Sequence, residues 1–347
     1  MKAAQLIAPG SLVVRDIDVP VPSAGEVLLQ VCAAGMCGSD AHIVHAKQAL
    51  FPLPLTLGHE TTARVETLGA GVTAWERGQT VSVAGIWGCG RCRACLDGRE
   101  NACEYWARRT PVPLGPGLGF PGGMAEWMVA PARALYALGD LDPVEAAPLA
   151  DAGVTPCHAI NLVRSHLRAD ATVAVIGVGG LGHMALQILR ATTACRIIAI
   201  DTDEGRLGSA KAHGADDVVR SDAHAAETIV QMTAGLGVQA VFDFAGVSPT
   251  LALANAIVAN YGALVIVGLG AGSATVIADA PPAGSPRWGV TLIRPYGATN
   301  RDIFEVIGLA QRGKLKADIE RHRLADAPQV LEALVQGRVR GRAVLVP

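Results

Sequence analysis

The chain has 347 residues, half of them hydrophobic, which is enough for about two domains with sizeable cores. Its 29 basic and 31 acidic residues give a net charge of −2, so it has neither the polycationic surface that nucleic acid requires nor an acidic tail. Aromatic residues make up 4% and glycines number 40, a balance typical of α/β packing with many tight turns.

The N-terminal segment and the hydropathy pattern bear on location. The first ten residues contain one lysine and a short apolar patch that Pro9 and Gly10 interrupt, unlike a secretory signal. No uninterrupted apolar run approaches the roughly 18 residues of a membrane helix. We therefore expect a cytoplasmic protein that associates with neither membranes nor nucleic acids.

Residues 11 to about 150 predict a mostly antiparallel β structure. Short β-rich runs such as 26–31 (EVLLQV) and 80–85 (TVSVAG) alternate with proline and glycine. From about residue 152 the pattern changes to a regular alternation of apolar strands with helical stretches. Strands are expected at 172–176, 196–200, 216–219, 240–244, 263–267 and 290–294.

The order of elements after residue 152 predicts a doubly wound parallel sheet, because a helix joins the first two strands. This helix, at 180–191, is amphipathic. Its apolar face is expected to comprise Leu181, Met184, Ala185, Ile188 and Leu189. The segments 301–313 and 342–347 return to helix and strand of a different character. We therefore expect a nucleotide-binding domain at 152–296 inserted in a first domain made of 1–151 and 297–347.

A glycine-rich turn, GVGGLG at 177–182, directly follows the first apolar strand of this domain. Gly177 would make the tight turn, Gly179 would let the backbone approach a pyrophosphate, and Gly182 would let the helix pack closely. The phosphates would bind at the helix N-terminus, where Gly180 and Leu181 complete the site. The competing interpretation is an ordinary β-turn.

An acidic residue, Asp201, ends the second strand. Its carboxylate would accept both ribose hydroxyls of NAD and repel the 2′-phosphate of NADP, which favours NAD. Arg206 follows about one helical turn later and would still tolerate a phosphate. A helix-capping aspartate is the alternative role for Asp201.

Four cysteines gather within fifteen positions, spaced C-x2-C-x2-C-x7-C. They are Cys89, Cys92, Cys95 and Cys103. Four thiolates close a tetrahedral shell around Zn²⁺ and leave no open position, so this pattern predicts a structural zinc. An iron–sulfur cluster fits less well, because of the seven-residue gap and the missing proline after the last cysteine. Balanced charges around the motif disfavour a zinc ribbon that binds DNA or a partner.

A second, more scattered set of candidate metal ligands lies nearer the N-terminus. Cys37 and Ser39 stand in GMCGSDAH, and His59 and Glu60 in LGHE. Taken alone, a lone cysteine or histidine is more often an ordinary core residue than a ligand.

The combination of GMCGSDAH, GHE, the four-cysteine lobe and GVGGLG resembles the zinc-dependent alcohol dehydrogenases of the medium-chain dehydrogenase/reductase superfamily, over essentially all 347 residues. Bacterial secondary-alcohol dehydrogenases and aryl ketone reductases are the most similar members, because they also place an aspartate where this chain has Asp151. The resemblance implies an α/β fold, with a Rossmann domain and a mostly β, GroES-like catalytic domain that carries a structural zinc lobe. It implies two zinc ions per chain, the catalytic one held by Cys37, His59 and Asp151, with Cys157 as the alternative third ligand.

The resemblance also implies the activity. Alcohols, mainly secondary and including bulky or aryl-substituted ones, would be interconverted with ketones or aldehydes by hydride transfer from a zinc-bound alkoxide to NAD. The hydroxyl of Ser39, followed by the ribose of NAD, would pass the proton to His42 as a base at the surface, unless His42 is simply an exposed histidine. Glu60 would approach the metal during ligand exchange, or else orient a buried arginine. Arg340 would contact the cofactor pyrophosphate, or else be solvated.

The substrate pocket and the assembly are likewise inferred by analogy. The pocket would include Phe51, Trp87, Leu114, Leu118 and Tyr296, together with Gly297, where close relatives have a tryptophan. Losing that indole would widen the pocket. The alternatives are a polyol or amino-alcohol dehydrogenase, which usually needs a polar pocket, and a non-catalytic redox regulator that binds zinc and nucleotide. A homo-oligomer is expected, either a dimer paired through the strand after 263–267 and through 290–294, or a tetramer of such dimers.

Overall fold

The computed structural model describes residues 1–110, 112–273 and 287–347. It divides into two compact units, one made of Met1–Val154 and Gly297–Pro347 and the other of Thr155–Tyr296. The expected strand between 263–267 and 290–294 would fall in 274–286, outside the described residues.

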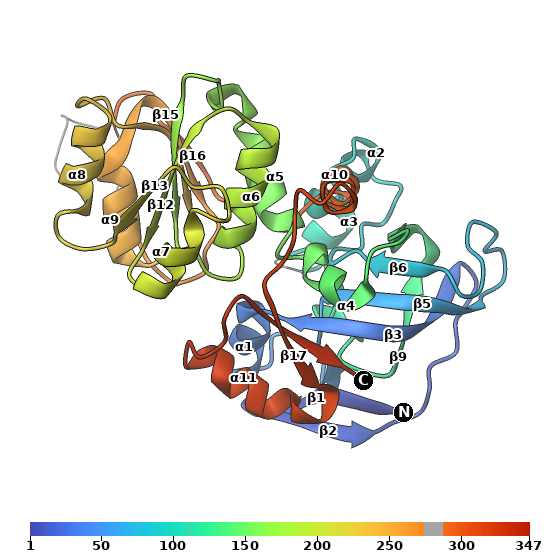
Figure 1. Ribbon diagram of the computed structural model, residues 1–347. Helices are drawn as coiled ribbons and strands as arrows, with labels where there is room; N and C mark the ends of the chain where they lie inside the picture. Colours follow the sequence, from blue (N-terminus) through green and yellow to red (C-terminus); the bar gives the residue numbers. More distant parts are fainter. Residues whose placement is uncertain (111, 274–286) are drawn as a thin grey trace. The chain divides into compact units, whose positions relative to one another are not determined.

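The second unit is a six-stranded sheet in the order β13-β12-β11-β14-β15-β16, and every neighbouring pair is parallel. The strands are β11 (Thr172–Ile176), β12 (Arg196–Asp201), β13 (Asp217–Arg220), β14 (Val238–Asp243), β15 (Val258–Ile266) and β16 (Thr291–Ile293). Helices lie on both faces of the sheet (Figure 1). They are α5 (Val154–Leu162), α6 (Gly182–Thr192), α7 (Glu204–Ala210), α8 (Ala225–Met232) and α9 (Ser248–Ile257). The predicted doubly wound parallel sheet is confirmed.

Burial on both faces explains why these strands are continuous apolar runs. In β12, the four residues 197–200 (IIAI) are fully buried, as expected for an inner strand of a parallel sheet. Four of the five residues of the predicted apolar face of α6 are buried, whereas Leu181 precedes the helix and is half-buried. Because His183 and Leu186 are buried as well, α6 is covered over more of its circumference than an amphipathic stripe would be.

The first unit is mostly antiparallel β structure, as predicted. Its main sheet runs β10-β6-β5-β3-β18-β17 with β9 also paired to β3, and a smaller sheet runs β2-β1-β4. The strands are β1 (Lys2–Ala8), β2 (Ser11–Asp16), β3 (Glu26–Met36), β4 (Leu55–Thr56), β5 (Glu60–Leu68), β6 (Thr80–Val83), β7 (Gly115–Pro116), β8 (Gly119–Phe120), β9 (Trp127–Pro131), β10 (Leu135–Ala137), β17 (Ile319–Arg323) and β18 (Arg342–Val346). The helices of this unit are α1 (Gly38–Val44), α2 (Arg93–Leu96), α3 (Glu104–Ala107), α4 (Pro143–Ala146), α10 (Asn300–Gln311) and α11 (Ala327–Val335).

Three neighbouring strands of the main sheet bring the candidate ligands together. Strand β3 ends one residue before Cys37, β5 begins one residue after His59, and β18 begins at Arg342. Gly35 pairs with Glu60 across β3 and β5, and a Cβ on Gly35 would lie 2.0 Å from Glu60 Oε2. Glycine is therefore required there if the Glu60 side chain is to lie over the sheet.

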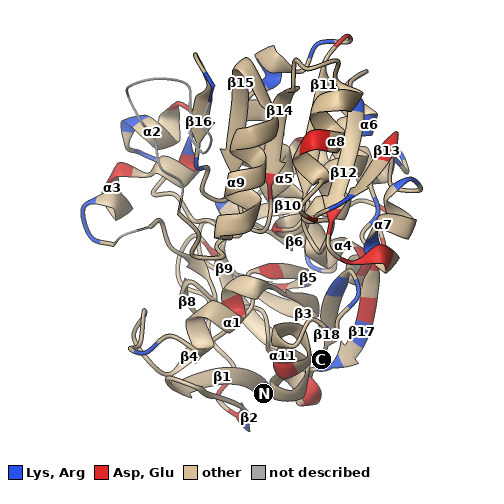
Figure 2. Ribbon diagram, turned by 90° about the vertical axis from the view of Figure 1, so that its left-hand side faces the viewer, with Lys and Arg blue, Asp and Glu red and all other residues tan. Residues whose placement is uncertain are grey.

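Basic and acidic residues are interspersed along the chain, in keeping with its near-zero net charge. Lys and Arg segments alternate with Asp and Glu segments on a mostly uncharged chain (Figure 2). Among the described residues, no helix combines the length and apolar character needed to cross a membrane.

Candidate active site

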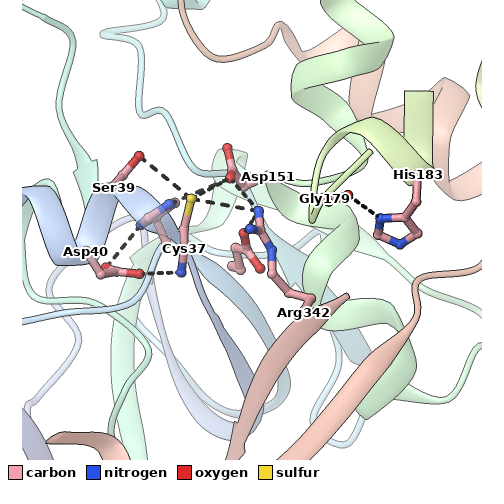
Figure 3. Close-up of polar contacts among 9 residues, drawn as sticks. Cys37, Ser39, Asp40, Asp151, Gly179, His183 and Arg342 are labelled. Carbon is pink, nitrogen blue, oxygen red and sulfur yellow. Dashed lines mark hydrogen bonds and ion pairs between the residues drawn. The ribbon is translucent and has the colours of Figure 1, made fainter. Parts of the chain in front are cut away.

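Four donor groups from three segments of the first unit converge on one point. The ligand atoms of Cys37, His59, Glu60 and Asp151 all lie within 4.8 Å of one another. Asp151 Oδ2 is 3.3 Å from Cys37 Sγ and 3.8 Å from His59 Nε2 (Figure 3). Neighbouring donors around a tetrahedral zinc, with bonds of about 2.0 to 2.3 Å, lie roughly 3.3 to 3.8 Å apart. The thiol, imidazole and carboxylate are therefore spaced as a zinc ion requires.

Asp40, which sequence reasoning missed, orients two of these donors. It is fully buried at the start of α1, where its Oδ2 accepts the backbone N–H of Cys37 at 2.8 Å. Its Oδ1 lies 3.4 Å from His59 Nδ1. Because that contact engages Nδ1, Nε2 is the nitrogen directed at Asp151 and at a metal, the usual carboxylate–histidine–metal arrangement. Burial alone would lower the pKa of His59, but Asp40 and Cys37 together raise it well above its ordinary value.

Arg342, also missed, is the cation of the site. Its Nη2 is 2.6 Å from Glu60 Oε1, 3.2 Å from Asp151 Oδ2 and 3.7 Å from Cys37 Sγ. Glu60 thus pairs with a buried arginine, the second of the two roles considered for it. Burial raises the pKa of Glu60 to about 8, with Asp151 adding to the rise and Arg342 opposing it. Arg340 is exposed, and its backbone N–H donates to Glu320 Oε1 at 2.8 Å.

The charge balance of this cluster favours a bound cation. Arg342 and a protonated His59 would contribute two positive charges, against up to four negative charges from the Cys37 thiolate and the carboxylates of Asp40, Glu60 and Asp151. Buried acids without compensating charge are costly or must take up protons. A divalent ion among the donor atoms would stabilise the thiolate and both neighbouring carboxylates, so the residues present fit zinc.

The two expected proton carriers follow Cys37 on α1. Ser39 Oγ is 3.7 Å from Cys37 Sγ, and the side chain is half-buried (Figure 3). His42 is exposed one helical turn later, on the same face of α1. The alternative ligand Cys157 is buried in α5, where Asn161 Nδ2 donates to its Sγ at 3.6 Å, whereas the donor cluster itself contains Asp151.

The four-cysteine lobe forms a second donor cluster in the same unit. The sulfurs of Cys89, Cys92, Cys95 and Cys103 lie within 4.8 Å of one another. Cys92 Sγ and Cys103 Sγ are 3.9 Å apart, close to the roughly 3.8 Å between sulfurs around a tetrahedral zinc. The backbone N–H of Cys95 lowers the pKa of Cys92 to about 6, whereas burial raises that of Cys95 to about 12. A metal would be needed to hold all four as thiolates.

In the second unit, the backbone of the glycine turn requires glycine at two positions. Gly177 adopts a φ of +86°, which favours glycine, and a Cβ on Gly182 would lie 1.9 Å from Gly177 O. At Gly179, the nearest neighbour of such a Cβ would be Arg206 Nη1, 3.9 Å away. Leu181 is the N-cap residue of α6, directly before its first residue, Gly182.

Asp201 is anchored to this turn. Its Oδ2 accepts the backbone N–H of Val178 at 2.7 Å, and its Oδ1 accepts that of Asp203 at 3.0 Å. Arg206 Nη1 lies 3.8 Å from the same carboxylate, with its side chain 43% exposed. The acid expected to bind ribose therefore also fixes the glycine turn to β12.

Four expected pocket residues of the first unit lie in two places. Trp87 is buried and stacks on Phe120 with 5.2 Å between ring centroids, and its backbone N–H donates to Leu114 O. Phe51 and Leu118 are half-buried against the core beneath α1 and α11.

The junction residue Gly297 is constrained by a neighbour that sequence reasoning missed. Gly297 has a φ of +53°, and a Cβ there would lie 2.2 Å from Ile86 Cδ1. Ile86 thus fills the space next to the Gly297 backbone, where the side chain of a tryptophan would begin. Tyr296, the last residue of the other unit, is half-buried.

Comparison with known proteins agrees with this architecture. The model of the alcohol dehydrogenase GroES-like domain matches residues 23–140, and that of the zinc-binding dehydrogenases matches residues 180–312. The chain is 33% identical to a NAD-dependent alcohol dehydrogenase of Sulfurisphaera tokodaii, with 100% of both chains covered. The crystal structure of an alcohol dehydrogenase from Aeropyrum pernix superposes with a TM-score of 0.88 at 33% identity, again covering 100% of both chains. An acetophenone reductase from Geotrichum candidum, solved with NAD, has a TM-score of 0.84 at 29% identity and covers 100% of this chain and 97% of that one.

The chain belongs to the zinc-dependent alcohol dehydrogenases of the medium-chain dehydrogenase/reductase superfamily. It is an oxidoreductase with a GroES-like and a Rossmann domain, as its motifs indicated.

Proposed function

We propose that this protein is a NAD-linked enzyme that interconverts secondary alcohols, including bulky and aryl-substituted ones, with their ketones. The observation that carries the proposal is the close approach of Cys37, His59 and Asp151, at the spacing of three ligands around a catalytic zinc. The NAD-dependent relative and the acetophenone reductase support the cofactor and the substrate class.

The protein's own residues have distinct tasks in this reaction. Zinc bound by Cys37, His59 and Asp151 supplies a Lewis acid that acidifies an alcohol and polarises a carbonyl, and the nicotinamide of NAD carries the hydride. Ser39 Oγ takes the hydroxyl proton during oxidation, and His42 releases it to solvent. In ketone reduction the same two groups return a proton to the substrate oxygen.

The surrounding charges keep the ligands in place. Asp40 holds His59 through Nδ1 and Cys37 through its backbone N–H. Arg342 donates to Asp151 and pairs with Glu60, which partly offsets the cost of burying these two acids beside each other. A carboxylate ligand is a harder and weaker donor than a thiolate, which leaves the metal more electrophilic than a two-cysteine site would.

The apolar character of the expected pocket supports ketones over sugars. Trp87, Leu114, Leu118 and Phe51 offer aromatic and aliphatic surface, whereas a polyol would need polar partners. Because Ile86 packs against Gly297, we expect the pocket to be narrower at this point than the loss of the tryptophan side chain would suggest.

We further propose a homodimer formed through β16, which can pair into a tetramer. β16 is the edge strand of the parallel sheet among the described residues. Leu292 of β16 is 44% exposed, and nearby Trp288 and Tyr261 are 62% and 77% exposed. An exposed strand edge flanked by large apolar side chains is typical of a surface that pairs with another chain.

A substrate panel tests the proposal. Initial rates should be followed at the NADH absorbance with 1-phenylethanol, 2-propanol and xylitol, using NAD and NADP in parallel. The proposal expects the highest kcat/KM for 1-phenylethanol with NAD, and only background rates with xylitol. Rates that decline steadily from short aliphatic to aryl substrates would refute the aryl preference. Higher activity on xylitol would favour the polyol alternative.

A further inference from the structure

His183, which directly follows the glycine turn, is buried where helix α6 begins. It is 3% exposed, and its Nδ1 lies 2.9 Å from the carbonyl oxygen of Gly179 (Figure 3). A carbonyl oxygen only accepts hydrogen bonds, so Nδ1 must carry the proton and donate it. The proposed reaction does not use this imidazole. Its burial and its contact with a backbone carbonyl also distinguish it from an ordinary surface histidine.

The carbonyl of Gly179 is held by two donors from the same residue. The backbone N–H of His183 donates to it at 3.1 Å, and the ring donates at 2.9 Å. In a planar trans peptide the C=O and the following N–H point in opposite directions. Since the carbonyl points back into α6, the N–H of Gly180 points out of the helix N-terminus. That is the direction in which a helix N-terminus binds phosphate.

The two halves of the turn therefore have different anchors. The N–H of Gly177 donates to Ile200 O at 2.8 Å and that of Val178 donates to Asp201, which ties the first half to β12. The second half is tied down by His183. The His183 ring is itself packed edge-on against His213, with 5.4 Å between ring centroids.

We propose that His183 is a positioning residue for the cofactor pyrophosphate: its Nδ1–H fixes the Gly179 peptide so that the Gly180 N–H is aimed at the phosphate oxygens. This inference rests on the proposed binding of a dinucleotide at the glycine turn. The proposed role needs the His183 ring only as a hydrogen-bond donor, so substitutions can distinguish this role from a role of the ring in packing.

The chain itself suggests matched variants. Gln187 Nε2, one turn along the same helix, donates to His183 O at 3.3 Å, so a glutamine can reach the carbonyl four residues before it. His183→Gln should therefore keep a donor to Gly179 O, whereas His183→Phe keeps the ring against His213 and lacks the donor. His183→Leu is a second variant without a donor, should the phenylalanine variant fold poorly.

Binding of ADP and of adenosine to the zinc-loaded protein, measured by calorimetry, tests the inference, because only ADP carries the pyrophosphate. Losing one hydrogen bond at the turn should raise the Kd for ADP by about five- to tenfold in the Phe and Leu variants, and leave adenosine binding unchanged. The Gln variant should remain within about twofold of wild type. The KM for NAD should rise in parallel, with kcat at saturating NAD little changed.

Three results would overturn the inference. ADP binding unchanged in the Phe and Leu variants would show that the donor is not needed. Equal weakening by Gln and Phe, or equal loss of ADP and adenosine, would show that His183 matters only for packing. Wild-type protein that binds no ADP at all would instead refute the proposed cofactor site, on which the inference rests.

Discussion

The substitution Asp40→Asn tests whether Asp40 positions the zinc ligands or only stabilises the fold. The carboxylate holds Cys37 N–H at 2.8 Å and faces His59 Nδ1 at 3.4 Å. Asparagine has nearly the same shape but no charge, and it presents only one acceptor oxygen. The variant can keep one of these two contacts and must weaken the other.

The expected cost falls on zinc affinity. Removing the outer partner of a ligating histidine typically lowers metal affinity by about 10- to 100-fold, which corresponds to about 1.4 to 2.7 kcal/mol. The four-cysteine cluster has no contact with Asp40 among those described, so its zinc should stay in place. The variant should retain one tightly held zinc and release the other at a lower chelator concentration than wild type.

A matched control is available in α10. Asp302 is also a buried N-terminal aspartate, and it accepts the N–H of Thr299 at 2.9 Å as Asp40 accepts that of Cys37. Asp302→Asn should therefore reproduce the loss of helix capping without the loss of zinc. Zinc release would be followed with a chromogenic chelator, alongside thermal unfolding. Equal zinc retention in Asp40→Asn and wild type, or equal zinc loss in both variants, would refute the reasoning.

Three other substitutions test separate parts of the account. Cys92→Ser should lower the zinc content from two ions per chain to one and the Tm by on the order of 5 °C, because three thiolates cannot close the shell; two retained zinc ions by elemental analysis would contradict this. Asp201→Ala should reduce the ratio of kcat/KM for NAD over NADP by about 10- to 100-fold, since it removes a charged acceptor and leaves Arg206 nearby, and an unchanged ratio would argue against a ribose contact. Burial raises the pKa of Glu60 from its ordinary 4.5 to about 8, so the folded zinc-free protein holds a proton that the unfolded chain releases, and its stability should fall as pH rises from about 5 to 8. Thermal unfolding of zinc-free Glu60→Gln should lack that decline, whereas a parallel decline in both proteins would assign it to other groups.

The sequence predicted those parts of the molecule that depend on local pattern. The parallel sheet follows from apolar strands alternating with helices, and the structural lobe from four cysteines within fifteen positions. Arg342 lies 305 positions from Cys37 and reaches it only because β18 pairs beside β3. Asp40 had a weak signal, an acid three residues after a ligand at a helix start. Ile86 had none, since its contact with Gly297 depends on the return of the chain to the first unit.

The histidine after the glycine turn illustrates a different limit. Its spacing from Gly179 is that of any helical neighbour, and only the ring orientation shows that it donates to the carbonyl. A histidine in that position is compatible with an apolar helix face, with a metal ligand or with a hydrogen-bond donor. Side-chain geometry was needed to choose among them.

X-ray absorption at the zinc edge, measured on Cys92→Ser protein so that the four-cysteine cluster is empty, tests the central claim most directly. The account predicts one sulfur near 2.3 Å and nitrogen or oxygen neighbours near 2.0 to 2.1 Å, from Cys37, His59 and Asp151 plus one exchangeable ligand. In Asp151→Cys the sulfur count should rise to two. Two sulfurs in the background protein with native Asp151, or a shell closed by four protein donors, would contradict the account.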